Sequence, residues 1–150
     1  MPSSRIASRP PDSAAIAEEL AAVGLRATRQ RIALLRLLRA AHDHPTAPQL
    51  HRAIRREQRR VSRKTVYEIL SSLVRAGLAS CVSEGGEAAH YEALVEPHYH
   101  ARCRVCDRLF DLPASADSQI RGRTRLPEGF RIEAIAVTIR GLCQRCRDAV

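Results

Sequence analysis

Apolar residues in the first half of the chain recur three and four positions apart, the spacing that lines one face of an α-helix. Asp12 or Ser13 can cap a first helix, which is predicted to reach about Val23 and to stop at Gly24. Thr28 is the predicted N-cap of a second helix with a broad buried face. The apolar residues expected to face the core of these two helices are Ile16, Leu20, Val23, Ile32, Leu34, Leu35, Leu37 and Leu38.

Two more helices are predicted before residue 78. Thr46 and Gln49 have the spacing of a capping box, so a third helix is expected over about residues 47–58. Ser62 can cap a fourth helix that stops at Gly77. The apolar residues expected to point inward from these helices are Leu50, Ile54, Val66, Ile69, Leu70, Leu73 and Val74.

The fourth helix exposes basic, hydroxyl and aromatic groups near its start, as the recognition helix of a helix-turn-helix does. These residues are Arg63, Lys64, Thr65 and Tyr67. Residues 78–83 and 88–93 flank a turn at residues 84–87 that contains two glycines, which predicts a hairpin. A hairpin in this position is the wing of a winged helix. The alternative is an ordinary helical bundle with a surface hairpin.

The pattern changes to strands after Pro97. Strands are expected at residues 98–104, 108–112 and 130–140, with a helix over residues 115–126. The last strand is apolar at most positions, so a helix and a partner subunit are expected to cover its two faces. The predicted fold is therefore α+β, a winged helix-turn-helix domain followed by a small α/β dimerisation domain. Its predicted parts are a disordered leader (1–12), a DNA-binding domain (13–94), a hinge (95–97) and a dimerisation and metal-binding domain (98–150).

The net positive charge of the chain lies in its first half. Residues 1–80 contain 15 Lys and Arg against 6 Asp and Glu, whereas residues 81–150 contain 10 of each class. A segregated basic half is typical of proteins that bind a polyanion, because Arg and Lys displace counterions from a phosphate backbone. An acidic protein partner or an inert solvated surface is the less favoured interpretation.

Two Cys-x-x-Cys pairs, separated by a domain-sized gap, predict a closed structural zinc site. Their cysteines are Cys103, Cys106, Cys143 and Cys146. Redox dithiols or disulfides would use the same residues. Since no apolar run has the length of a membrane span or a signal peptide, the protein is expected in the cytoplasm, where thiols stay reduced and zinc is favoured. Cys81, outside this quartet, is expected to be a small buried residue.

His98 and His100 lie two positions apart, which on a strand places both imidazoles on one face. With Asp111 they could form a second site of nitrogen and oxygen ligands, suited to iron, manganese or zinc. The alternative is a partly exposed strand that carries two polar side chains.

Taken together, several motifs of the chain resemble the ferric uptake regulator family over about residues 13–147. The motifs are Leu25-Arg26-Ala27-Thr28-Arg29-Gln30-Arg31, His44-Pro45-Thr46, Ser62-Arg63-Lys64-Thr65-Val66-Tyr67, His98-x-His100-x-x-Cys103-x-x-Cys106 and Cys143-x-x-Cys146. The resemblance implies a homodimeric, metal-dependent transcriptional repressor that binds a palindromic operator in double-stranded DNA.

The same resemblance implies structural Zn(II) on the four cysteines and a regulatory Fe(II) or Mn(II) site. The regulatory ligands would be His44, Glu92, His98, His100 and Asp111. Such an ion would join the DNA-binding half to the dimerisation half and so set the separation of two recognition helices. The residues predicted to contact DNA are Arg26, Arg63, Lys64, Thr65 and Tyr67.

His98-Tyr99-His100 and Asp111 look most like the peroxide-responsive branch, in which Fe(II) directs oxidation of a ligand histidine and releases the repressor. Such a reaction inactivates the protein without turnover, so the chain is not expected to be an enzyme. Glu92 departs from that branch and resembles iron-responsive relatives, and Ile135 replaces a histidine that many relatives use for an additional site. Glu68 stands where arginine is common, so operator preference is expected to differ.

Three alternatives stay open. The first is an iron-responsive or zinc-responsive repressor of metal uptake without peroxide chemistry. The second, from another class, is a thiol oxidoreductase, which needs an exposed cysteine of low pKa at a helix start, whereas these pairs are expected at strand ends. The third is a zinc-stapled nucleic-acid scaffold that has no switch.

Overall fold

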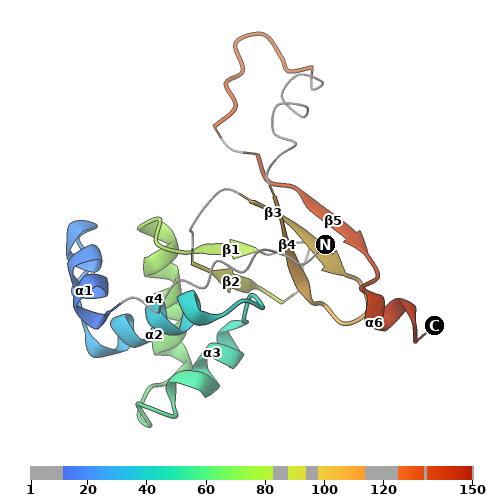
Figure 1. Cartoon of the computed structure of the whole chain (residues 1–150). Coiled ribbons are helices and arrows are strands. Elements are labelled where there is room, and N and C mark those ends of the chain that lie inside the picture. Colours follow the sequence, from blue (N-terminus) through green and yellow to red (C-terminus); the bar gives the residue numbers. More distant parts are fainter. Residues whose placement is uncertain (1–11, 83–87, 94–97, 114–124, 134, 150) are drawn as a thin grey trace. The chain divides into compact units, whose positions relative to one another are not determined.

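In a computed structural model, the chain forms two compact units, residues Met1–Leu94 and Val95–Val150. The structure describes residues 12–82, 88–93, 98–113, 125–133 and 135–149 (Figure 1). The helices of the first unit and the small sheets after them confirm the predicted α+β class. The expected leader, up to residue 11, lies outside the described residues, as do residues 115–124 of the expected helix in the second unit.

The helices of the first unit are α1 (Ser13–Ala22), α2 (Arg29–Ala40), α3 (Ala47–Ile54) and α4 (Arg63–Arg75). Thr28 and Ser62 cap their helices as predicted, since the Thr28 hydroxyl accepts from the Arg31 N–H at 3.3 Å and the Ser62 hydroxyl accepts from the Thr65 N–H at 3.0 Å. Gly24 follows α1 with φ +76, a conformation that glycine adopts without steric cost.

Helix α3 is shorter than predicted, because it ends at Ile54 and not near Gln58. Its start agrees with the prediction, with the Thr46 N–H donating to the Gln49 side chain at 2.6 Å. Beyond Ile54, the side chain of Gln58 donates to the Arg29 carbonyl at 3.1 Å, and Glu57 pairs with Arg36. These contacts with α2 hold the segment after α3 in turns, an outcome that local helix propensity does not predict.

The core of the first unit is aliphatic, as the hydrophobic pattern predicts, and α2 packs against α1, α3 and α4. Ile32, Leu37 and Val74 are only partly buried against this core, and Val23 is exposed. Burying each large aliphatic side chain contributes roughly 1.5–3 kcal/mol before the conformational entropy is counted. The largest side chains with less than 2% exposure are Ile16, Leu20, Leu34, Leu35, Leu38, Ile54, Leu70, Leu73 and Val66.

The hairpin after α4 consists of β1 (Ser80–Val82) and β2 (His90–Glu92), which pair antiparallel. Both strands are shorter than predicted, and the predicted turn at residues 84–87 lies outside the described residues. Strand β2 also pairs with the loop before α3, where Thr46 forms a bridge with His90 and the Tyr91 N–H donates to the Pro45 carbonyl at 3.0 Å. The loop that carries His44 is therefore anchored to the hairpin.

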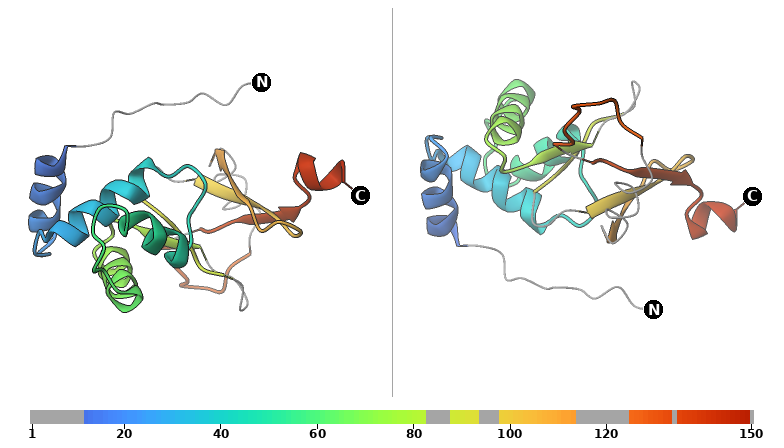
Figure 2. Two further views of the ribbon diagram at one scale, coloured as in Figure 1. Left: turned by 90° about the horizontal axis from the view of Figure 1, so that it is seen from below. Right: turned by 90° about the horizontal axis from the view of Figure 1, so that it is seen from above.

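The second unit contains a three-stranded sheet in the order β4-β3-β5. Its strands are β3 (His98–Cys103), β4 (Leu109–Pro113) and β5 (Thr138–Gly141). Strand β3 runs antiparallel to β4 and parallel to β5, and the short helix α6 (Gln144–Arg147) follows β5 (Figure 2).

The prediction of one long strand over residues 130–140 is wrong, because a strand begins only at Thr138. Residues 130–140 do alternate, but their neighbouring strand β3 begins only at His98, and His100 of β3 already pairs with Thr138. Strand β3 is therefore too short to pair with most of the residues before Thr138. Among the described residues, no strand runs alongside the segment from Arg125 to Glu133. Without backbone partners, an apolar period of two does not make a strand.

Among the described residues, no helix is both long enough and apolar enough to cross a membrane.

Candidate metal centres and nucleic-acid interface

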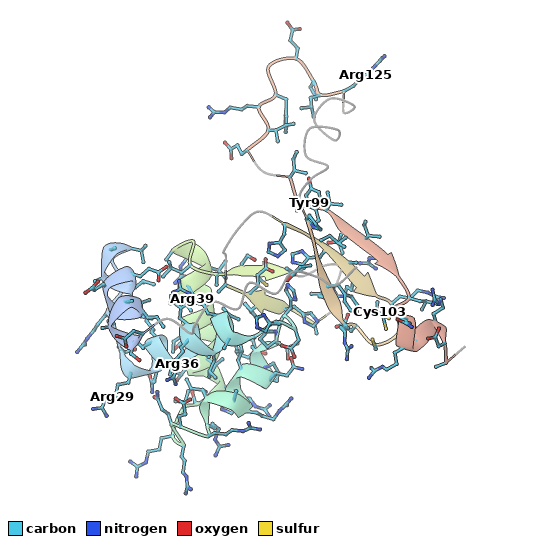
Figure 3. All side chains as sticks on the ribbon, in the orientation of Figure 1. Arg29, Arg36, Arg39, Tyr99, Cys103 and Arg125 are labelled. Atoms are coloured by element: carbon cyan, nitrogen blue, oxygen red, sulfur yellow. The ribbon has the colours of Figure 1, made fainter. Side chains whose placement is uncertain are left out.

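Four cysteines meet at one end of the sheet in the second unit. Cys103 ends β3, where sulfur atoms gather (Figure 3), and Cys106 follows it in a turn. Cys143 is the N-cap of α6 and Cys146 lies within that helix, so the prediction that both pairs lie at strand ends is wrong for the second pair. The four Sγ atoms lie within 4.8 Å of one another.

The spacing of the sulfur atoms fits a tetrahedral zinc ion. The Sγ atoms of Cys106 and Cys143, one from each pair, are 3.7 Å apart. Zinc–sulfur bonds of about 2.3 Å in a regular tetrahedron place neighbouring sulfurs about 3.8 Å apart. All five cysteines of the chain are free of disulfide bonds.

Backbone N–H groups around the first pair favour a thiolate. Hydrogen bonds from the N–H groups of Cys143, Cys106 and Val105 lower the pKa of Cys103 to about 6. By contrast, hydrogen bonding with Cys143, followed by burial, raises the pKa of Cys146 to about 12. Neighbouring thiolates repel one another, so a cation is needed before all four can lose their protons together. The donor set therefore fits a closed zinc centre with four cysteine ligands.

The second unit also gathers nitrogen and oxygen ligands on one face of its sheet. His98 and His100 project from the same face of β3, with ring centroids 4.7 Å apart. Asp111 lies directly opposite His100 on β4. Its Oδ1 atom lies 3.5 Å from the His98 Nε2 atom and 3.9 Å from that of His100. His100 is buried and Asp111 is exposed, so this ligand group lies partly open to solvent.

In the first unit, His44 and Glu92 form a pair. The His44 Nε2 atom lies 2.9 Å from a Glu92 carboxylate oxygen, and the His44 side chain is only 4% exposed. His44 has a φ of 49, which is unusual for a residue other than glycine and is found at sites where surrounding contacts hold the backbone. This unit thus brings one imidazole and one carboxylate close enough together to bind the same metal ion.

Ser80 and His90 hold this pair in place, and sequence reasoning did not single them out. Ser80 lies opposite Glu92 in the hairpin and donates from its hydroxyl to the Glu92 Oε1 atom at 2.5 Å. The buried His90 donates from Nδ1 to the His44 carbonyl at 2.5 Å. The alternation of the two strands could have suggested the Ser80–Glu92 contact, whereas the His90–His44 contact spans 46 residues and leaves no local signal.

The start of α4 presents the predicted DNA-contacting groups. Arg63, Lys64 and Tyr67 are exposed, and Thr65 is half-buried, with its hydroxyl hydrogen-bonded to that of Ser62 at 2.9 Å. Glu68 lies 3.7 Å from Lys64 and offsets part of its charge. Arg26, before α2, is also exposed.

Additional arginines precede α4 along the chain. They lie at the end of α3 and in the turn after it, are all exposed, and were not named among the predicted DNA contacts. They are Arg52, Arg55, Arg56, Arg59 and Arg60. On α2, by contrast, Arg36 and Arg39 (Figure 3) pair with Glu57 and Glu19. The turn between α3 and α4 therefore carries much of the basic surface of this unit, as binding a phosphate backbone requires.

Cys81 is exposed on β1, so the prediction of a small buried residue is wrong. It lies opposite Tyr91 in the hairpin. Burial, and secondarily the neighbouring Cys81 thiol, raises the pKa of Tyr91.

The family model, the similar sequences and the similar solved structure all point to one family. The sequence model of the ferric uptake regulator family matches residues 22–140. The transcriptional regulator FurA of Mycobacterium bovis is 33% identical over 131 residues, which cover 87% of this chain and 88% of FurA. The peroxide operon regulator of Bacillus subtilis is 29% identical over 129 residues, covering 86% of this chain and 89% of that regulator. Among solved structures, the ferric uptake regulator of Helicobacter pylori matches with a TM-score of 0.78 at 19% identity, covering 93% of this chain and 97% of that chain.

Proposed function

The chain belongs to the ferric uptake regulator family of metal-responsive transcriptional regulators, and we propose that it is a homodimeric repressor whose operator affinity depends on a bound divalent ion. The observation that carries this proposal is the presence of candidate metal ligands in both units. His44 and Glu92 lie in the unit with the basic recognition helix, and a second ligand group lies on the sheet of the other unit.

We propose that one ion, Fe(II) or Mn(II), takes ligands from both groups. Imidazole and carboxylate ligands suit these ions better than the four thiolates do. An ion held from both units restricts their relative orientation, and in a dimer this sets the distance between two recognition helices. Half-sites on one face of a duplex lie about 34 Å apart, or a multiple of it. Metal then raises operator affinity only as far as it binds the DNA-competent arrangement more tightly than other arrangements.

Dimerisation is supported by the sheet face of the second unit that lies opposite the histidines. Phe110 on β4 and Ile139 on β5 both lie beside Ala101 of β3, and they are 39% and 55% exposed. Apolar side chains that cluster on a surface are typical of protein interfaces. We propose that a second copy of the chain covers this face.

We further propose that the regulator senses peroxide. Bound Fe(II) would supply the electrons that cleave peroxide. We expect bound Mn(II) not to react with peroxide in this way. His98 and His100 would be the oxidised ligands, because both rings project beside the Asp111 carboxylate at a partly exposed site. An imidazole that has gained an oxygen atom is a poorer ligand, so the unit would release its ion and the repressor its operator. The competing proposal is iron sensing without oxidation, which Glu92 favours by its likeness to iron-responsive relatives.

DNA binding by defined metal forms tests both proposals. A labelled operator duplex, selected from random sequences by the Mn(II)-loaded protein, is titrated with chelated, Mn(II)-loaded and Fe(II)-loaded protein. The chelated form is expected to bind poorly and both metal forms tightly. After brief exposure to peroxide, only the Fe(II) form is expected to lose binding and to gain an oxygen atom at His98 or His100. If both metal forms keep their affinity, iron sensing without peroxide chemistry is the correct function. If chelation has no effect, the protein has no metal switch.

Replacing Ser80 with alanine is expected to weaken Mn(II) binding without unfolding the first unit. The Ser80 hydroxyl orients the Glu92 carboxylate, and a hydrogen bond to a charged acceptor contributes about 1.5–3 kcal/mol. Since water can replace part of this bond, we expect a loss of roughly fivefold to tenfold in affinity, measured by Mn(II) titration. Ser71→Ala is the control, because Ser71 is exposed on α4 and its hydroxyl accepts a hydrogen bond from Arg75 of the same helix. Unchanged Mn(II) affinity in Ser80→Ala would mean that this contact does not position Glu92.

A further inference from the structure

A buried arginine lies next to the metal ligands of the second unit. Arg102 is only 3% exposed, and its Nε atom donates to the Asp107 carboxylate at 2.6 Å. A buried guanidinium is costly unless a carboxylate compensates for its charge, and removing one partner of such a pair is more harmful than removing both. Loss of Asp107 alone is therefore expected to destabilise this unit more than loss of both side chains.

The carboxylate partner belongs to the turn that carries the first cysteine pair. Asp107 directly follows Cys106, and its N–H donates to the Cys103 carbonyl at 2.9 Å. Its φ of 61 lies in the left-handed region, which glycine adopts freely and aspartate only occasionally. The Asp107 carboxylate pairs with the Arg102 guanidinium from this position.

The arginine belongs to the strand that carries the histidine ligands. Strand alternation places Arg102 on the same face of β3 as His98 and His100. On β4, Asp111 lies opposite His100 and the buried Leu109 lies opposite Arg102, and on β5 the exposed Arg140 lies opposite Arg102. The ion pair therefore joins the turn that holds two zinc ligands to the strand segment that orients two imidazoles.

We propose that the Arg102–Asp107 pair couples the two metal centres of this unit. Closing the four thiolates around zinc holds the turn and Asp107 in place, and Asp107 then holds Arg102 and the ligand face of β3. Zinc in the four-cysteine centre thereby raises the affinity of His98, His100 and Asp111 for their divalent ion. By thermodynamic linkage, that ion slows the loss of zinc in return. The coupling rests on the regulatory site proposed above and makes zinc occupancy a second input to the repressor.

Mn(II) binding by zinc-loaded, full-length variants tests the coupling. Asp107→Gly removes the carboxylate but relaxes the backbone, so weaker Mn(II) binding could not result from a strained turn. The double variant Arg102→Leu with Asp107→Gly also removes the buried charge, and it is expected to retain zinc and thermal stability. Both variants are expected to bind Mn(II) about tenfold more weakly than the wild type. Arg104→Leu, at an exposed neighbouring arginine, is the matched control and should match the wild type.

The reciprocal measurement is the rate at which zinc passes to a zinc-selective chelator. Saturating Mn(II) is expected to slow this transfer in the wild type and in Arg104→Leu, but not in the double variant. A stable double variant with wild-type Mn(II) affinity would show that the pair is only a structural ion pair. If the wild type binds Mn(II) and zinc transfer is nevertheless unchanged, the coupling is wrong and the regulatory site stands. If the wild type binds no Mn(II), the regulatory site itself is wrong.

Discussion

Replacing Cys103 with serine is expected to abolish zinc binding and to unfold the second unit. Cys103 is 2% exposed, ends β3 and accepts the Cys143 N–H at 3.4 Å, so it connects the first Cys-x-x-Cys pair to the second. Small units bury too little apolar surface to be stable alone, and a structural zinc ion contributes about 10–16 kcal/mol to such folds.

Metal analysis and thermal unfolding measured by circular dichroism check this expectation. Cys81→Ser is the matched control, because Cys81 is exposed on β1 of the other unit and lies outside the cysteine cluster. We expect the control to retain stoichiometric zinc and the wild-type melting temperature. A Cys103→Ser protein that keeps its zinc and its unfolding transition would exclude a structural zinc centre on the four cysteines.

Replacing His100 with alanine is expected to remove the response of DNA binding to Mn(II). His100 is 8% exposed and lies directly opposite Asp111, so its imidazole is the most enclosed ligand on the sheet of the second unit. Coupling between two binding sites in proteins is commonly worth about 5-fold to 150-fold in affinity, and the variant should lose that difference. Its metal-free affinity for DNA should stay as low as that of the metal-free wild type.

His42→Ala is the matched control for this substitution. His42 is an exposed histidine in the loop before α3, outside the candidate ligand groups. Titration of a labelled operator with and without Mn(II) compares the two variants. An Mn(II) response that survives in His100→Ala would mean that the histidines of β3 do not form the switch.

Much of the first unit could be predicted because its signals are local. Thr28 and Ser62 cap helices through hydrogen bonds that reach only three residues along the chain. The end of α3 was mispredicted because Gln58 makes its contact with Arg29, a residue 29 positions away. Helix propensity contains no information about such a partner.

The candidate sites also contain some features that local sequence predicts and others that depend on distant contacts. The four-cysteine site could be predicted from the spacing of the two pairs. The placement of His98 and His100 on one face of a strand could be predicted from their separation by two residues. The roles of Ser80 and His90 depend on strand register and on a loop that pairs with β2. The Arg102–Asp107 pair also could not be predicted, since a turn with a left-handed aspartate is not evident from composition.

Pulsed electron paramagnetic resonance of the Mn(II)-loaded protein can show whether one ion binds to ligands from both units. The modulation of the Mn(II) signal by nitrogen reports how many imidazoles are bound. We expect signals from His44, His98 and His100 in the wild type, with one imidazole lost in His44→Ala and one in His100→Ala. Identical nitrogen signals in the wild type and in His44→Ala would contradict this expectation, because the ion would then be held by the second unit alone.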